Sequence, residues 1–206
     1  MLSITGMIAL AALIVWLAFF LLGTTQTAAR TGRRVWLFGT ARGLDRLAAL
    51  GFRGAFVLAV TGPLLWLAIP ALHKADPLWV EDRASLLAMI GAVLAYLGAA
   101  LALVAQWSMG ASWRVGVQAE ETGALVNDGL FRVSRNPTFL GQAMLLIGVA
   151  LAVPSLPTAL APLLFLWSAH VQIRSEEAAL LAKHGRTYAD YMARTPRWIG
   201  LPKGRP

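Results

Sequence analysis

The sequence has no cysteine and unusually little charge. Without cysteine, the chain has no disulfide, no thiolate nucleophile and no cysteine-ligated metal site. Its three histidines, His73, His170 and His184, stand at unrelated spacings, so we predict no metal site. Only 14% of the residues are charged, whereas a soluble domain carries about a quarter. These absences exclude thiol chemistry and point away from a soluble protein.

Apolar residues are instead gathered in long uncharged runs. Residues 1–29 and 84–113 contain no charged side chain, and 136–173 contains no ionisable group except His170. A helix needs about 20 apolar residues to cross a hydrocarbon core of about 30 Å. With 58% hydrophobic residues and a mean hydropathy of +0.64, the chain is predicted to be an all-α integral membrane protein.

The uncharged runs divide into five predicted membrane spans. The spans are expected at about 2–22, 52–72, 85–107, 137–153 and 156–173. The last two come from one stretch that Pro154 and Pro157 interrupt, since proline ends a helix. We therefore expect a helical hairpin over 137–173. Two regions follow, a three-span region at 1–107 and a core at 108–206.

The basic residues predict how the spans are oriented. Arg53 and three segments, 23–51, 108–136 and the tail after 173, hold 16 of the 18 Lys and Arg residues. Lys and Arg concentrate on the cytoplasmic side of membrane proteins. Five spans with the N-terminus outside place all of these residues, and the C-terminus, in the cytoplasm. We expect a bacterial inner membrane, with the net charge of +8 facing anionic lipid and no nucleic-acid partner.

Two of the basic segments are predicted to lie at the membrane surface. The 23–51 connection has the pattern of an amphipathic surface helix or a lipid-anchoring loop, and it could also be only a basic topological anchor. In the tail, apolar residues recur at helical spacing as far as Gly185, a typical helix stop. A second short helix would carry Tyr188 and Tyr191 and end before Pro196. The tail is therefore predicted to be a cytoplasmic helix-turn-helix.

The polar residues at the open end of the hairpin are the first candidates for chemistry. Because the two arms are antiparallel, Arg135, Asn136, Arg174, Glu176 and Glu177 should surround one mouth. Ionisable groups at the edge of a membrane helix are costly to bury and are often functional. Such a cavity would suit a zwitterionic ligand, although an ion-pair cluster that only anchors the hairpin fits equally well.

Two neighbouring segments could line the same cavity. The turn "NDGLF" at 127–131 would expose backbone donors and acceptors of the kind that an adenine edge requires. Trp113 and Arg114 follow the third span directly. They are either an aromatic-belt tryptophan with an interfacial arginine or a wall of a substrate pocket.

The order of these motifs resembles a known enzyme family. "LVNDGLFRVSRNPTFLGQ", an apolar hairpin and "IRSEEAALLAKHGRTYADYMARTPRWI" are similar to the isoprenylcysteine carboxyl methyltransferase and phospholipid methyltransferase family of membrane enzymes. The resemblance covers about 108–199. It implies that S-adenosylmethionine binds in a cytoplasmic pocket roofed by the C-terminal helices, and that a lipophilic acceptor enters from the bilayer.

The resemblance also implies particular donor-binding positions. Those that match the family pattern are Leu125, Val126, Gly129, Arg135, Asn136, Pro137, Phe139, Glu176, Glu177, Tyr188, Tyr191 and Arg194. Two positions depart from the pattern. Asn136 stands where histidine is commoner, which removes a titratable group, and Phe139 stands in place of tyrosine. An asparagine amide can still bind a ligand carboxylate, so donor binding is the better-supported role for this element.

Methyl transfer needs mainly positioning, because the donor is already activated. A carboxylate acceptor needs no base, whereas an amine, phenol or thiol would use Glu176 or Glu177. We expect these glutamates to hold ligand and Arg174 or Arg135 to orient the acceptor, which makes the four the candidate catalytic residues. The acceptor could be an isoprenylcysteine-type carboxylate or another lipophilic acid, thiol, amine or phospholipid.

Two other functions stay open on the sequence. Membrane sterol reductases share a similar C-terminal arrangement and use NADPH, whose 2′-phosphate would call for additional cations. A non-catalytic membrane protein that handles lipids would need neither nucleotide. The methyltransferase interpretation requires Arg135 and Glu177 to lie close enough to contact one small molecule.

Overall fold

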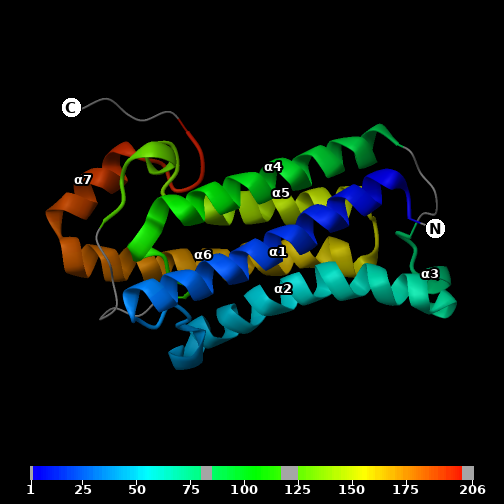
Figure 1. Ribbon diagram of the computed structural model, residues 1–206, viewed down its shortest axis with the longest axis horizontal. Helices are drawn as coiled ribbons and strands as arrows, with labels where there is room; N and C mark the ends of the chain where they lie inside the picture. The colour runs from blue at the N-terminus through cyan, green and yellow to red at the C-terminus, as the bar shows by residue number, and fades with distance from the viewer. Residues whose placement is uncertain (1, 80–84, 117–124, 201–206) are drawn as a thin grey trace.

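The computed structural model describes residues 2–79, 85–116 and 125–200. Within these residues the chain is helical and has no β-strand, which confirms the predicted all-α fold (Figure 1). The helices are α1 (Ile4–Thr31), α2 (Gly43–Ala68), α3 (Pro70–Ala75), α4 (Leu86–Met109), α5 (Pro137–Ala152), α6 (Leu156–His184) and α7 (Arg186–Arg194). Short 3-10 helices are η1 (Phe38–Thr40), η2 (Gly110–Ser112) and η4 (Gly129–Arg132).

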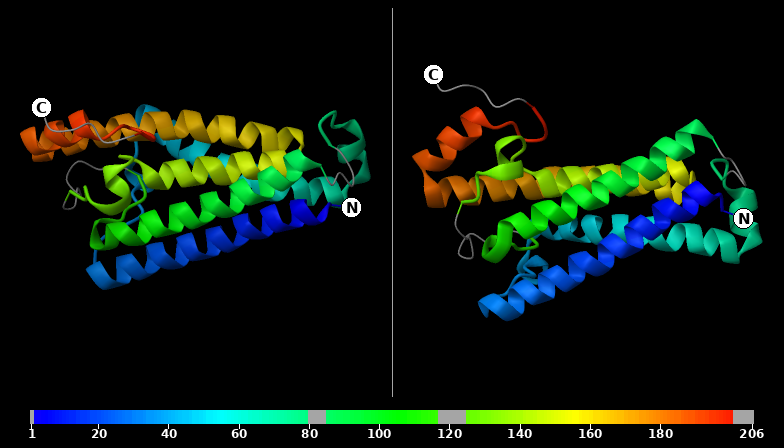
Figure 2. Two further views of the ribbon diagram at one scale, coloured as in Figure 1. Left: turned by 90° about the horizontal axis from the view of Figure 1, so that it is seen from above. Right: turned by 45° about the horizontal axis from the view of Figure 1, so that its top comes forward.

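Five of these helices form an elongated bundle. Helices α1, α2, α4 and α6 are long and apolar enough to cross a membrane, and α5 is a shorter apolar helix of 16 residues. Figure 2 shows α4 lying between α1 and α5, and Figure 1 shows α2 running along α6. At 1.5 Å per residue, α5 is about 24 Å long. The fourth predicted span, 137–153, is therefore present as the shortest helix of the bundle.

Glycines bring α4 and α5 into backbone contact. A Cβ added at Gly98 would lie 2.4 Å from the backbone nitrogen of Leu145, and one added at Gly148 would lie 2.3 Å from that of Ala95. Small residues allow such close approach between helices in a membrane, where van der Waals packing drives helix association. This contact holds α5 firmly in the bundle and so fixes the position of its N-terminus at Pro137.

The predicted hairpin is present with the predicted break. Helix α5 ends at Ala152 and α6 begins at Leu156. A capping box begins α6, in which the side chains of Ser155 and Thr158 each accept a hydrogen bond from the backbone N–H of the other residue. The Thr158 hydroxyl also donates a 2.6 Å hydrogen bond to the carbonyl of Val153. The turn is therefore closed by its own polar groups.

The connections gather at the two ends of the bundle as the basic residues predict. In Figure 1, 32–42, the described parts of 110–136 and the tail after α6 lie at one end, and the N-terminus and the α5–α6 turn lie at the other. The three basic segments therefore share an end, which we call the basic end. That this end faces the cytoplasm stays a prediction.

The 23–51 connection differs from the predicted surface helix. Helix α1 continues to Thr31, and the following residues fold into the bundle. The Leu37 N–H donates to the carbonyl of Val115, and the Val115 N–H donates to that of Val35, both at 2.8 Å. The side chains of Val35 and Leu37 are buried. Burying these apolar residues against the bundle removes them from water more completely than an interfacial position would.

The tail also differs in one respect from the predicted helix-turn-helix. Its first helix is not separate, because α6 runs unbroken from Leu156 to His184. The fall in hydropathy after residue 173 marks the end of the apolar run and not the end of the helix. Charged residues such as Glu and Lys are good helix formers, so the helix continues through them. The predicted stop is confirmed at Gly185, whose φ of 51° favours glycine, and α7 ends at Arg194 as expected before Pro196.

Candidate active site

The hairpin brings Arg135 and Glu177 into direct contact. Arg135 lies just before α5, and Glu177 lies near the end of α6. The Arg135 Nη2 atom is 2.7 Å from Glu177 Oε1, and both side chains are largely buried. Arg135 and Glu177 are therefore close enough to contact one small molecule, as the methyltransferase interpretation requires.

A second arginine, Arg197, binds the same carboxylate. Its Nε donates a 3.0 Å hydrogen bond to Glu177 Oε1, and its Nη2 forms a short ion pair with Oε2. The hydrogen bond from Arg197 to Glu177 raises the pKa of Arg197 above its ordinary value. Both oxygens of Glu177 are thus bonded to guanidinium groups. We call Arg135, Glu177 and Arg197 the arginine–glutamate cluster.

The cluster fastens the tail across the end of the hairpin. The Arg135 Nη1 atom donates to the carbonyls of Met192 at 3.1 Å and Thr195 at 2.6 Å, and its backbone N–H donates to that of Pro196 at 2.9 Å. The Asn136 amide donates to the carbonyl of Arg197 at 2.9 Å. Arg135 and Asn136 therefore position α7 and the following residues over the site.

Two adjoining cavities lie beside this cluster. The end cavity is enclosed by α7, the end of α6 and the segment before η4, and the bundle cavity extends between the helices. The bundle cavity contains about 620 Å³ of space, part of it open to the exterior. Residues that line both cavities are Met109, Arg114, Phe131, Arg135, Asn136 and Glu176. The two cavities thus share a wall that carries charged and amide groups.

The end cavity combines aromatic and charged groups. Residues that line this cavity alone include Leu125, Val126, Glu177, Leu180, Tyr188 and Tyr191. The Tyr191 hydroxyl donates a 2.6 Å hydrogen bond to the carbonyl of Phe131, so α7 is bonded to η4. Burial raises the pKa of both Tyr188 and Tyr191 well above the ordinary value. The two phenols therefore stay protonated at neutral pH, so both offer a ring surface to a ligand and the Tyr188 hydroxyl can also donate a hydrogen bond.

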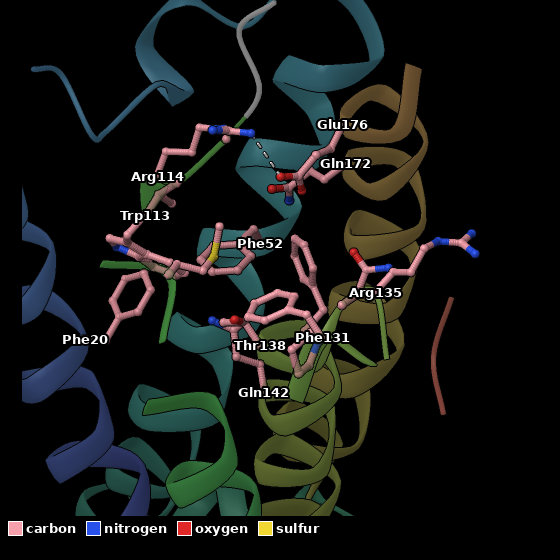
Figure 3. Close-up of a pocket in the computed structure, with 16 residues that line it drawn as sticks. Phe20, Phe52, Trp113, Arg114, Phe131, Arg135, Thr138, Gln142, Gln172 and Glu176 are labelled. Atoms are coloured by element: carbon pink, nitrogen blue, oxygen red, sulfur yellow. Dashed lines mark hydrogen bonds and ion pairs between the residues drawn. The ribbon is translucent and has the colours of Figure 1, made fainter. Parts of the chain in front are cut away.

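The bundle cavity is mainly apolar and aromatic (Figure 3). Its walls include Phe20, Phe52 and Phe139. Trp113 also lines it, is 6% exposed and donates from Nε1 to the hydroxyl of Thr24 at 3.1 Å. The structure therefore places Trp113 in the cavity wall, not in an aromatic belt facing lipid.

Glu176 and Arg114 form a looser pair at the shared wall. Arg114 Nη2 lies 3.5 Å from Glu176 Oε1, as Figure 3 shows. The Nε of Arg114 is buried and has no hydrogen-bond partner in the described part of the chain. In contrast to Glu177, Glu176 keeps one carboxylate oxygen without a bond to a guanidinium among the described residues. Both groups can therefore still bind a ligand.

Comparison with known proteins agrees with this architecture. Residues 86–187 match the model of the phospholipid methyltransferase family. The chain belongs to that family. The matched residues hold α4, α5, α6 and both glutamates, so the family region builds most of the shared wall. Membership makes this chain a membrane methyltransferase of lipid substrates. No curated protein matches it.

Three residues of the predicted site lie away from both cavities of this family member. Gly129 is exposed and begins η4 with a φ of 51°. Arg174 is exposed and lines neither described cavity. Arg194 donates from Nε to the carbonyl of Asp190 at 3.1 Å, which holds it on α7. Because side chains on a helix rotate by about 100° per residue, Arg174 points away from the face that carries Glu176.

Two predicted donor-binding residues belong to the bundle cavity instead. Pro137 and Phe139 line only that cavity. Proline is favoured at the first position of a helix because it needs no hydrogen-bond acceptor there, and α5 begins at Pro137. The first turn of α5 is thus the boundary between the two cavities. Asn136 faces both of them, and Phe139 faces the apolar one.

Sequence reasoning missed several residues of the site. Arg197 completes the arginine–glutamate cluster, and Phe20 and Phe52 come from α1 and α2. Gln142 and Gln172 lie inside apolar helices and line the bundle cavity. A buried amide within a membrane span is a signal that could have found these two glutamines.

Proposed function

We propose that this methyltransferase uses S-adenosylmethionine, which binds in the end cavity, and methylates a lipid that binds in the bundle cavity. The observation that carries the proposal is the pair of adjoining cavities with different chemistry and a common polar wall. An aromatic and charged cavity suits a zwitterionic nucleoside, and an apolar cavity suits a lipid. Arg114 and Glu176 lie where the two ligands would meet.

The groups of the end cavity fit the donor. Tyr188 and Tyr191 offer ring faces, the Tyr188 hydroxyl can donate a hydrogen bond, and backbone groups near Leu125 and Val126 are suited to the adenine edge. The Glu176 carboxylate can bind an ammonium group, since charge-assisted hydrogen bonds are the strong ones. S-adenosylmethionine supplies an activated methyl group for in-line displacement, so the protein contributes mainly alignment.

Glu176 is the carboxylate that we assign to the reacting groups. Glu177 is already bonded by Arg135 and Arg197, and its role is to hold the tail over the donor. Glu176 can orient an acceptor or take a proton from an amine, phenol or thiol. For an acceptor that is itself a carboxylate, Arg114 provides the matching charge.

The competing cofactor, NADPH, fits the end cavity less well. Its 2′-phosphate would require cations that are free to bind it. Of the two arginines among the described residues of the end cavity, Arg135 is paired with Glu177 and bonded to carbonyls of the tail, which leaves only Arg114, loosely paired with Glu176, to bind an anion. This pairing favours S-adenosylmethionine over a dinucleotide.

Donor binding is tested with a substitution that places a large side chain in the end cavity. Isothermal titration of the full chain in lipid nanodiscs should show S-adenosylmethionine binding that NADPH does not displace. Val126→Trp should abolish it, because Val126 lines the cavity. Asn127→Trp is the matched control, since Asn127 is the exposed neighbour and its side chain does not line the cavity. Binding that survives Val126→Trp would place the donor elsewhere.

The acceptor is identified by product analysis. The protein in nanodiscs is incubated with methyl-labelled S-adenosylmethionine and a bacterial lipid extract, and the labelled product is separated and characterised. A labelled lipid that Val126→Trp abolishes and Asn127→Trp preserves supports the proposal. Donor binding without any labelled product would indicate a non-catalytic lipid-handling protein.

A further inference from the structure

Two glutamine side chains in the bundle cavity have polar atoms that the protein does not satisfy. Gln142 on α5 is 2% exposed, and Gln172 on α6 is 4% exposed. Among the residues that the structure describes, the buried Oε1 of Gln142 and the buried Nε2 of Gln172 have no hydrogen-bond partner. Both side chains line the cavity and are labelled in Figure 3. Two side chains of the cavity wall therefore each keep one polar atom without a hydrogen bond, an acceptor on Gln142 and a donor on Gln172.

Retaining these amides works against the stability of the fold. A buried polar atom without a partner loses its hydration and gains nothing in return, whereas leucine of similar size would pack in the same place at no such cost. The surrounding walls include the aromatic side chains of Phe20, Phe52 and Phe139, and no described residue forms a hydrogen bond with either buried atom. Residues that oppose stability in this way are typical of sites that bind a ligand.

The two glutamines lie at a defined distance from the shared wall. Gln172 stands one helical turn before Glu176 on α6, and Gln142 stands one turn after Thr138 on α5. Since the two helices are antiparallel, the backbones of both residues lie about one turn, or about 5 Å, deeper in the bundle than those of Thr138 and Glu176.

We propose that Gln142 and Gln172 determine acceptor specificity by binding an uncharged hydrogen-bonding group of the lipid, such as an amide, an ester carbonyl or a hydroxyl. This inference rests on the proposed function. Each glutamine side chain carries both a donor and an acceptor, so it can form a hydrogen bond with any of these neutral groups. The acceptor is thus a neutral amphiphile in the part that occupies the cavity.

A phosphate is a poor occupant of this part of the cavity. Among its described lining residues the cations are Arg114 and Arg135, and both belong to the shared wall, where each faces a glutamate. Glutamine supplies no net charge, and an anion buried without a counter-charge is strongly disfavoured. The glutamines therefore select against a charged group at their depth.

Binding of simple amphiphiles tests the selection without any need for methyl transfer. The probes are radiolabelled dodecanamide, dodecyl phosphate and dodecane, measured with the full chain in nanodiscs against empty nanodiscs. Dodecanamide should bind more tightly than either of the others. Gln142→Leu and Gln172→Leu should each weaken dodecanamide binding about fivefold, and the double variant about 30-fold, as hydrogen bonds of about 1 kcal/mol give. Dodecane binding should not fall.

Thermal unfolding shows whether Gln142 and Gln172 serve to bind a ligand or to stabilise the fold. In the absence of probe, Gln142→Leu and Gln172→Leu should raise the unfolding temperature or leave it unchanged, because an unsatisfied amide is removed. Ser168→Ala is the matched control, since Ser168 is also buried with an unpaired hydroxyl on α6 but lines neither cavity. It should leave dodecanamide binding unchanged.

Several results would overturn the inference. Equal binding of dodecanamide and dodecane, preference for dodecyl phosphate, or leucine variants that unfold earlier and keep full dodecanamide affinity would each do so. Failure of S-adenosylmethionine binding would instead contradict the proposed function, and it leaves the amphiphile measurements free to decide whether the glutamines bind a neutral polar group.

Discussion

Glu176 and Glu177 are neighbours in the sequence, but their carboxylates differ in their bonding partners and in the cavities that they line. Glu177 is bonded through both oxygens to Arg135 and Arg197, and it lines only the end cavity. Glu176 has a single longer contact, 3.5 Å from Arg114, and it lines both cavities. Successive helical residues point about 100° apart, so adjacent glutamates can serve two separate surroundings.

This difference in bonding indicates a structural role for Glu177 and a chemical role for Glu176. A carboxylate held by two guanidiniums has few remaining sites for a ligand, and its removal would leave two cations without their counter-charge. A carboxylate with one loose partner keeps lone pairs for ammonium groups or protons. On this basis Glu177 holds the tail in place, and Glu176 is available to ligands at the junction of the cavities.

The largest expected effect is that of Glu177→Ala on folding stability. Removing one partner from a buried ionic network costs about 3–5 kcal/mol, because the remaining charges lose their compensation. We expect a loss in this range, measured by chemical unfolding in detergent micelles, together with weaker donor binding because α7 is no longer fastened. An unchanged unfolding curve would contradict the structural role of Glu177.

Glu176→Gln should affect chemistry more than stability. The substitution keeps the size and polarity of the side chain, and Arg114 loses only a long contact, so unfolding should change by less than about 1 kcal/mol. Methyl transfer should fall about 100-fold, the lower end of the usual loss when a proton-accepting or orienting group is removed. The check is initial rates of labelled product at saturating donor. Near-normal rates would assign the reaction to another group.

Most of the fold could be predicted from the sequence, because helices that contact lipid consist of long uncharged runs of apolar residues. Uncharged runs located the spans, and Pro154 and Pro157 located the hairpin turn. Helix ends were less accurate, since hydropathy reports contact with lipid and not the helical conformation. Helix α1 therefore continues past the apolar run to Thr31, and α6 continues through the charged residues to His184.

The site was predictable where it depends on the hairpin alone. Antiparallel arms place Arg135 beside Glu177, which requires no knowledge of the other helices. Arg197 was not predictable, because its position depends on how the tail turns back after α7. Phe20 and Phe52 were missed for a related reason, since no local pattern tells which faces of α1 and α2 meet the hairpin.

Tyr191→Phe should have a smaller effect that is confined to the end cavity. The Tyr191 hydroxyl donates to the carbonyl of Phe131 at 2.6 Å, and this bond joins α7 to η4. Its loss should reduce the free energy of unfolding by about 1 kcal/mol, the usual net value of one hydrogen bond. Donor affinity should fall severalfold, whereas dodecanamide binding in the bundle cavity should stay unchanged. Equal weakening of both ligands would mean that the two cavities do not act separately.

Arg197→Ala should have the smallest effect, and it tests how Glu177 divides its bonds between two arginines. The Arg197 side chain is 38% exposed, so water and salt screen its charge. Glu177 also keeps Arg135, which is 11% exposed and bonded to two carbonyls of the tail. We expect a loss of up to about 1 kcal/mol in the free energy of unfolding, and the loss should shrink at high salt. A loss as large as that of Glu177→Ala would show instead that Arg197 alone fastens the tail, with Arg135 contributing little.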